Sequence, residues 1–424
     1  MRFIYAVRAF QLVQTSPSKN RFSRIHSNQS STSVVLLCAS NRLFLMKKKF
    51  AFCLTLCLFG LLNQSFGQPK NDNSVVVVDG STAYETPKVF ELMNIAFALT
   101  DTSKAYFSTI DTTTQYYKEV IRHFATFRSH KLVRALTEQV KKNASTYAFN
   151  LTTGSDLLLV NGKLARANRF PPERKIWNDL HSVHQKSIED FSRLSGFEQF
   201  YVAHQEYYAK MLQQSKEYAR VAAMQQWLEK EFPIKYDKIA TFISPLMRGS
   251  HWGVHFTHKG ENVSLMYVSA ANGYNNGKRT KQQILGIYTG ISFTEIDHFY
   301  VNPISDRFEK ELNQLMGGEN RNNWTKPTYG SNLYDNGYKV FNEYMTHGVY
   351  LLYTNAKYAK EDQEVIKKHR IRLKSELRKY HRFEDFYTQL EKLYLSKPSN
   401  KTLADLYPDI IEWCKRQNLQ PIKS

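Results

Sequence analysis

A five-residue segment, Thr294 to His298, has the spacing of a catalytic metal-binding helix. In the motif His-Glu-x-x-His, two imidazoles lie one helical turn apart and bind one Zn²⁺, while the Glu between them activates a water molecule. Here the sequence is Thr-Glu-Ile-Asp-His, so Glu295 and His298 stand at the positions of the base and of the second ligand. Thr294 stands at the position of the first ligand, and its hydroxyl cannot replace an imidazole on zinc. If the helix continues, Asn302 lies on the same face as these side chains.

Two further candidate ligands follow in a second predicted helix. Glu343 comes 45 residues after His298, and His347 comes four residues after Glu343, so that both can project from one helix face. Together with His298 they would give Zn²⁺ three protein ligands and leave Glu295 as the base. Asp297 could support a ligand by hydrogen bonding, although on an ideal helix it points away from His298. The alternative is a metal-free cluster in which these polar groups satisfy one another.

Two short motifs extend the pattern toward a known family. Val301-Asn302-Pro303 follows the first segment, and Asn342-Glu343-Tyr344 forms the start of the second. With them, residues 75–353 resemble an uncharacterised family of secreted bacterial zincin-like proteins, a domain of unknown function, whose members show an H-E-x-x-H helix running into V-N-P and a later N-E-Y helix. The resemblance implies a gluzincin-like fold and a metallopeptidase ancestry, with the Glu of the later helix as third zinc ligand. Thr294 departs from this pattern.

The elements around these residues predict an α+β fold that is mainly helical, with a small, mostly antiparallel sheet next to the motif helix. Runs of β-branched and aromatic residues joined by short turns predict a meander of three strands, and two shorter runs predict isolated strands. The expected strands are 239–247, 252–257 and 263–269 in the meander, and 75–78, at a sheet edge, and 157–160 elsewhere.

Apolar residues at helical spacing predict that most of the remaining chain is helical. The expected helical regions are 87–143, 173–231 with a break near Gly196, 282–299 with Pro303 ending or kinking it, 306–316, 336–353, 361–380, 383–395 and 403–416. We divide the chain into a mainly helical part, a zincin-like core with the sheet and the motif helices, and C-terminal helices. These parts are residues 68–235, 236–355 and 356–424.

The N-terminal residues predict export. Met46 is followed by three lysines, a 13-residue apolar run from Phe50 to Leu62 and the small-x-small sequence Ser65-Phe66-Gly67, which is the pattern of a secretory signal peptide. We therefore expect a signal peptide at 46–67, a mature chain from Gln68 and a periplasmic or secreted location. Residues 1–45, which resemble a transit peptide in composition, are more simply an upstream extension that is not native. The apolar run is too short to span a membrane, so no span is expected in the mature chain.

Charge and cysteine content narrow the possible partners. The whole chain carries +20, and removing residues 1–67, with nine Lys or Arg and no acid, leaves about +11. The densest basic part lies at 367–379, where a helical charge run indicates a solvated face, so no nucleic-acid partner is expected. Of the four cysteines only Cys414 remains after residue 67. The mature chain therefore has no intrachain disulfide.

Two hypotheses of different class follow for the function. The first is an exported zincin-like peptidase with a rearranged or degenerate Zn²⁺ site, acting on a peptide or protein substrate; Glu295 would deprotonate the metal-bound water. The second is a catalytically inactive zincin-fold protein that binds a peptide, a glycan or a protein partner. A third and weaker hypothesis uses the basic segment 367–379 on an anionic surface. Zinc is the only cofactor that the sequence suggests.

Overall fold

The computed structural model describes residues 74–100, 109–143, 145–171, 178–271, 279–326 and 334–419. The predicted signal peptide, its cleavage point near Gln68 and the upstream extension lie outside the described residues. Contacts group the described residues into one compact unit. Among the described helices, none combines the length and the apolar character needed to cross a membrane.

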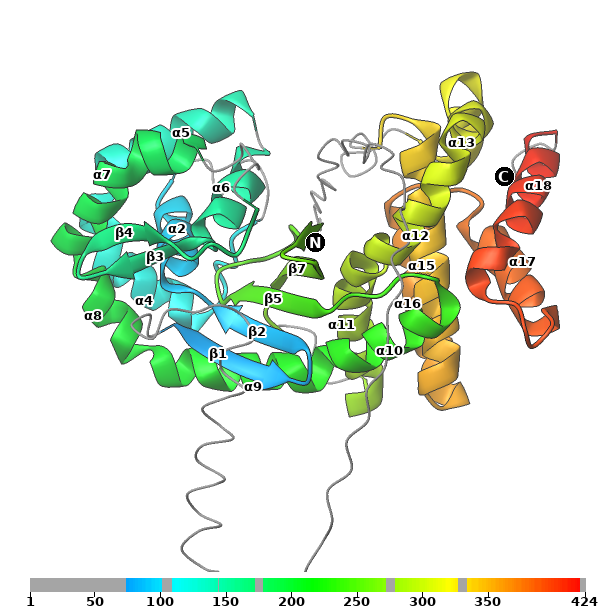
Figure 1. Ribbon diagram of the computed structural model, residues 1–424, viewed down its shortest axis with the longest axis horizontal. Coiled ribbons are helices and arrows are strands. Elements are labelled where there is room, and N and C mark those ends of the chain that lie inside the picture. The colour runs from blue at the N-terminus through cyan, green and yellow to red at the C-terminus, as the bar shows by residue number, and fades with distance from the viewer. Residues whose placement is uncertain are drawn as a thin grey trace, which may run out of the picture. The chain divides into compact units, whose positions relative to one another are not determined.

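A five-stranded mixed sheet lies at the centre of this unit (Figure 1). Parallel pairing joins its three inner strands, and an antiparallel strand closes each side. The strands in spatial order are β1 (Val75–Asp79), β2 (Thr82–Thr86), β5 (Lys238–Ser244), β7 (Glu261–Ser269) and β6 (Trp252–His258). The mainly helical α+β prediction is confirmed, and each predicted strand is present.

The predicted meander is wrong, and the sheet is mixed instead of mostly antiparallel. Strand β7 lies between β5 and β6, because the chain passes from β5 to the sheet edge before it returns. The burial of the strands explains this order. Nearly every residue of β5 and most of β7 are buried, as in interior parallel strands. In β6 only Trp252 and Val254 are buried, and the other positions are partly or fully exposed, as in an edge strand.

A separate hairpin pairs β3 (Leu157–Val160) with β4 (Lys163–Arg166). Its two turn residues, Asn161 and Gly162, have φ angles of 49° and 73°. A two-residue Asn-Gly turn with both φ angles positive is the connection that matches the twist of antiparallel strands. The strand predicted at 157–160 is therefore confirmed.

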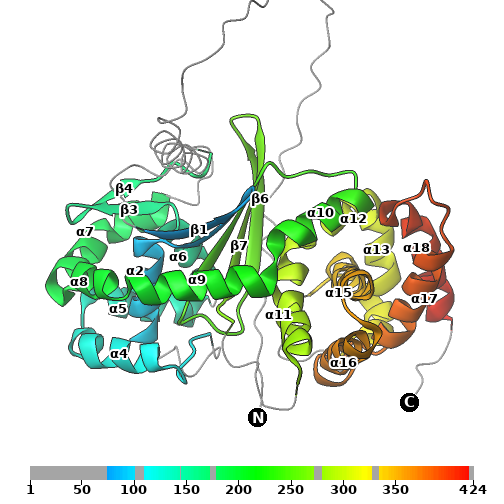
Figure 2. The same ribbon diagram turned by 90° about the horizontal axis from the view of Figure 1, so that it is seen from below.

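The helices of the first half are shorter than the predicted regions, and turns divide them. They are α2 (Lys88–Ala98), α4 (Gln115–Phe124), η1 (Ala125–Phe127), α5 (Lys131–Lys142), α6 (Thr146–Gly154), α7 (Asn178–Ser195), α8 (Phe197–Ala203), α9 (Gln205–Ala219) and α10 (Val221–Glu231). Gly196 breaks the chain between α7 and α8 as expected, with a φ of 67° that favours glycine. Helix α9 packs against β1, β2 and α11 (Figure 2).

The second half contains the motif helices. Its elements are α11 (Lys281–Ile296), α12 (His298–Ser305), η3 (Asp306–Phe308), α13 (Glu309–Met316), η4 (Gly318–Asn320), α14 (Arg321–Trp324), α15 (Gly337–Lys357), α16 (Lys360–Ile371), the π-helix η6 (Arg372–Leu377), α17 (Phe383–Ser396), η7 (Leu403–Leu406) and α18 (Tyr407–Asn418). A capping box of Thr280 and Gln283 starts α11.

Pro303 lies inside α12 and does not end it. Proline has no N–H, so the carbonyl of Phe299 lacks its usual helical donor four residues later. The hydroxyl of Tyr236 donates to this carbonyl at 3.1 Å and replaces the missing bond. A tertiary contact thus lets the helix continue through the proline.

Helix α15 lies in the interior of the second half, where it contacts α11, α12, α13, α16 and α17 (Figure 2). All of its residues from Gly337 to Thr354 except Lys339 are buried. A helix that is buried on every side cannot send polar side chains to water, so Glu343 and His347 must find partners inside the protein.

Candidate functional site

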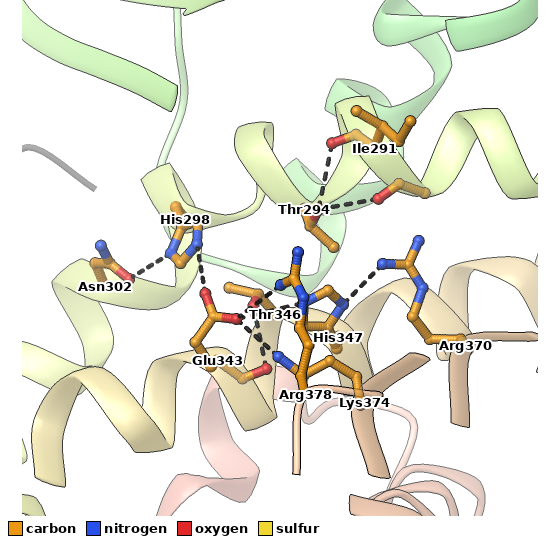
Figure 3. Close-up of polar contacts among 11 residues, drawn as sticks. Ile291, Thr294, His298, Asn302, Glu343, Thr346, His347, Arg370, Lys374 and Arg378 are labelled. Atoms are coloured by element: carbon orange, nitrogen blue, oxygen red, sulfur yellow. Dashed lines mark hydrogen bonds and ion pairs between the residues drawn. The ribbon is translucent and has the colours of Figure 1, made fainter. Parts of the chain in front are cut away.

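The polar cluster around Glu343 joins side chains from three helical segments (Figure 3). Helix α12 contributes His298, and α15 contributes Glu343 and His347. The segment formed by α16, η6 and the residue after it contributes Arg370, Lys374 and Arg378. The contacts α12·α15, α11·α15 and α15·α16 hold these segments together.

The structure brings together the three residues predicted as metal ligands. The Nε2 atom of His298 lies 3.7 Å from Oε1 of Glu343, and Nε2 of His347 lies 3.5 Å from Oε2 of the same carboxylate. Glu343 and His347 are almost fully buried, while 12% of the His298 side chain is exposed. The Nδ1 atom of His298 donates to Oδ1 of Asn302 at 3.2 Å, so Asn302 orients this ring.

Thr294 takes no part in this cluster through its hydroxyl. Its Oγ1 donates to the carbonyl oxygens of Gly290 at 2.9 Å and Ile291 at 3.2 Å, in its own helix (Figure 3). This backward hydrogen bond is the usual solution for a threonine inside a helix. The hydroxyl at the position of the motif's first histidine therefore already has its hydrogen-bond partners.

Two further carboxyl groups, Glu295 and Asp297, are buried beside the cluster. Burial raises the pKa of Glu295 to about 7, with the charge of Glu343 adding to the rise and that of His298 opposing it. Asp297, between α11 and α12, is fully buried, and neither of its carboxyl oxygens has a hydrogen-bond partner among the described residues. Burial raises its pKa well above the usual value. At a given pH both carboxyl groups are therefore ionised to a smaller extent than Glu343.

Lys374 is the residue that the sequence did not reveal. Its Nζ donates to Oε2 of Glu343 at 2.8 Å, its side chain is 0% exposed, and it lies 3.7 Å from the centre of the Tyr380 ring. Burial alone would raise the pKa of Glu343, but the charge of Lys374 and the neighbouring His298 and His347 bring it well below the usual value. Burial lowers the pKa of Lys374 to about 7, with the charge of Glu343 opposing the shift. At and below that pH the 2.8 Å contact therefore pairs an ionised carboxylate with a buried ammonium group.

Arg370 determines the state of His347. A guanidinium nitrogen of Arg370 lies 2.9 Å from Nδ1 of His347, and its plane covers the Tyr350 ring at 4.3 Å. Because arginine only donates hydrogen bonds, Nδ1 must be the acceptor. Burial, with the positive charges of Lys374 and Arg370, holds the pKa of His347 well below its usual value, so the ring is neutral and carries its proton on Nε2.

The acidic groups around His298 shift its pKa upward, in the opposite direction to the pKa of His347. Burial alone would lower the pKa of His298, but the carboxylate of Glu343 and the nearby Asp297 and Glu295 raise it to about 9. Arg378 adds a second cation, with a guanidinium nitrogen 3.8 Å from Oε2 of Glu343. The two histidines of the cluster thus differ in charge although both contact the same carboxylate.

The predicted solvated face at 367–379 is wrong for part of this segment. Arg370, Lys374 and Arg378 recur every four residues; the first turns toward His347 and the other two toward Glu343. By contrast, 71% of the Arg372 side chain is exposed. The π-helix helps to place them: the N–H of Arg378 donates to the carbonyl of Leu373, five residues earlier, at 3.1 Å. The four-residue spacing of the basic residues was the available signal, but neighbouring exposed lysines obscured it.

The residues in this arrangement do not fit the zinc ion that the resemblance implies. Lys374 already holds Oε2 of Glu343. A zinc-bound histidine donates its second ring N–H to an acceptor, and His298 does so to Asn302, but His347 accepts from Arg370 and keeps its proton on Nε2. Among the described residues, no three His, Cys, Asp or Glu side chains are placed to share a metal ion.

Comparisons of the chain with family models, with curated proteins and with solved structures found no match. The resemblance to secreted zincin-like proteins therefore stays a prediction.

Proposed function

We propose that the protein is an exported, zincin-like binding protein that has no peptidase activity. The observation that carries the proposal is the buried ammonium group of Lys374, 2.8 Å from Glu343. Zincin hydrolysis needs a metal-bound water next to a general base. Glu295 supplies such a base, but two of the three predicted ligands, Glu343 and His347, are engaged by cations of the chain itself.

An extended peptide is the ligand that the neighbouring sheet edge favours. Among the described strands, β6 pairs with β7 alone and closes one side of the sheet. An edge strand can accept a further strand from a peptide through main-chain hydrogen bonds. Strand β6 lies directly on the motif helices, since a Cβ atom at Gly253 would come 3.5 Å from the Glu295 carbonyl oxygen. A peptide on β6 would therefore run beside the cluster.

The first experiment tests for metal and hydrolysis. Residues 68–424 are purified, bound zinc is measured by elemental analysis, and digestion of an unfolded protein substrate is followed with and without added Zn²⁺. We expect no stoichiometric zinc and no digestion. One zinc per chain that is lost in His298→Ala, with digestion that is lost in Glu295→Gln, would overturn the proposal.

The second experiment tests the ligand. Binding to an array of extended peptides is measured, and each positive peptide is resynthesised with alternate backbone nitrogens methylated. Pairing with β6 predicts that one methylation pattern abolishes binding and that the other leaves it, because alternate N–H groups face the strand. Binding of glycans or folded proteins, with no peptide bound, would favour the other ligand classes.

One observation favours a zinc peptidase as second candidate. In a tetrahedral site with zinc–ligand distances of about 2.0–2.1 Å, the ligand atoms lie about 3.3 Å apart. The 3.7 Å and 3.5 Å separations around Glu343 are close to that value. This candidate requires Lys374 to leave Glu343 and Arg370 to leave His347, and the zinc measurement on the unmodified chain decides between the two.

A further inference from the structure

We infer that Lys374 and Arg370 take the place of a metal ion in this cluster, and that removing both cations uncovers a latent site for a divalent cation formed by His298, Glu343 and His347. The inference rests on the proposed function in one respect, because it takes the unmodified chain to be free of metal. It adds the identity of the groups that keep the metal out and the ligands that would bind it.

The charges of the cluster support the replacement. Arg370 and the ammonium form of Lys374 together carry two positive charges, which equals the charge of one divalent ion. Both side chains are buried, so each stands against Glu343 or His347 without water between them. An ionised carboxylate in the interior needs a cation or donors around it, and at Glu343 the ammonium group fills this need.

The positions of the donor atoms support the latent site. The two Nε2 atoms lie at different oxygens of one carboxylate, at 3.7 Å and 3.5 Å. Zinc ligands lie about 3.3 Å apart, so each imidazole is close to metal-binding distance from one carboxylate oxygen. Because no three such side chains of the described residues share an ion in their present positions, release of Glu343 from Lys374 must also let the carboxylate move until both rings reach the same ion. His298 is already oriented by Asn302 in the way that a zinc-bound histidine requires.

Two contacts oppose metal binding: Lys374 holds Glu343, and Arg370 independently holds His347 through a hydrogen bond. While Nδ1 of His347 accepts from Arg370, the proton of the neutral ring stays on Nε2, the atom that would bind the metal. A glutamine at position 370 carries a side-chain oxygen that can accept from Nδ1–H, which leaves Nε2 bare. Removal of Lys374 alone is therefore not sufficient, and both positions must change.

The experiment compares the double variant Lys374→Met with Arg370→Gln against the unmodified chain and a matched control. The control, Lys368→Met with Arg372→Gln, makes the same changes at exposed positions of the same segment. Co²⁺ is added to each protein, and the absorption bands of tetrahedral cobalt are recorded, followed by displacement with Zn²⁺. We expect one Co²⁺ per chain in the double variant, bound at least 100-fold more tightly than by the other two proteins.

Adding His298→Ala to the double variant should abolish this binding. A folded double variant that binds no more Co²⁺ than the control would overturn the inference and leave the proposed function standing. Stoichiometric zinc in the unmodified chain would instead overturn the proposed function.

A measurement on the unmodified chain keeps the inference testable if the double variant does not fold. The ¹⁵N shifts of labelled histidines report which ring nitrogen carries the proton, and His347→Asn assigns the signal. We expect His347 to have a bare Nδ1 and a protonated Nε2. A His347 ring with its proton on Nδ1 would overturn the role of Arg370.

Discussion

Replacing Lys374 by methionine tests the central ion pair. The substitution keeps the length and apolar stem of the side chain but removes the ammonium group from Oε2 of Glu343. Removing one partner of a buried ion pair costs about 3–5 kcal/mol in the free energy of unfolding, because the other charge stays buried. After the substitution, His298, His347 and Arg378 still lie 3.5–3.8 Å from the Glu343 carboxylate, farther than the 2.8 Å of the lost contact. These neighbours compensate part of the carboxylate charge. We therefore expect about 3 kcal/mol, the lower end of the range.

The matched control removes an ion pair from the same segment at the surface. Arg372 lies 3.3 Å from Glu376, and about two thirds or more of each side chain is exposed. An exposed pair of this kind contributes about 0.2–1 kcal/mol. Arg372→Met should therefore shift the urea unfolding midpoint far less than Lys374→Met, with an unchanged slope in both.

The double variant Glu343→Gln with Lys374→Met completes the measurement. Once the carboxylate is gone, the loss of the ammonium group leaves no uncompensated charge, so the double variant should be more stable than Lys374→Met alone. Urea unfolding followed by tryptophan fluorescence gives the free energies of unfolding of the unmodified chain, of the single variants Glu343→Gln and Lys374→Met, and of the double variant. A Lys374→Met protein within 1 kcal/mol of the unmodified chain, with no coupling to Glu343, would refute the pairing.

Three other predictions concern stability elsewhere. Burial raises the pKa of Glu91 to about 8, so the protonated side chain stabilises the fold fully below the unfolded pKa of about 4.5, and this stabilisation is lost as the pH rises toward 8. In urea unfolding between pH 5 and 9, the free energy of unfolding of Glu91→Gln should therefore rise by up to about 4 kcal/mol relative to that of the unmodified chain. A Cβ at Gly253 would lie 2.4 Å from Cζ of Phe299, so Gly253→Ala should lower stability by about 1–3 kcal/mol, and Phe299→Leu should recover part of it in thermal melts. Tyr236→Phe should cost about 1–2 kcal/mol in the unmodified chain but less in Pro303→Ala, where a helical N–H can serve the Phe299 carbonyl; equal losses would contradict this role of the hydroxyl.

Local patterns carried most of the fold prediction. Short-range alternation and turn residues identify every strand of the main sheet except β2, and they also identify β3 of the separate hairpin, because these features depend on neighbours in sequence. The order of β5, β7 and β6 was not predictable in the same way. It depends on which strand is buried on both faces, and that follows from helices packed far away in sequence.

The site shows the same limit at the level of side chains. Four-residue spacing on a helix predicted that Glu343 and His347 share a face, and the motif spacing predicted His298 opposite them. Lys374 escaped prediction because a lysine in a basic run normally faces water. Its orientation depends on the π-helix, which changes the face that a residue presents and has no signature in this sequence.

The buried carboxylate of Glu343 connects two features of the site, the threonine at the position of the motif's first histidine and the cations that contact the cluster. Without a metal, Glu343 would remain ionised in the interior of α15 and would need another positive partner. Lys374 supplies this partner, while Arg370 fixes His347 in the form that leaves Nε2 protonated. The hydroxyl of Thr294 has its hydrogen-bond partners within its own helix. Under the proposed function, the cations from the α16 segment and the threonine at position 294 therefore belong to one arrangement, in which Glu343 and His347 have their partners in the chain itself.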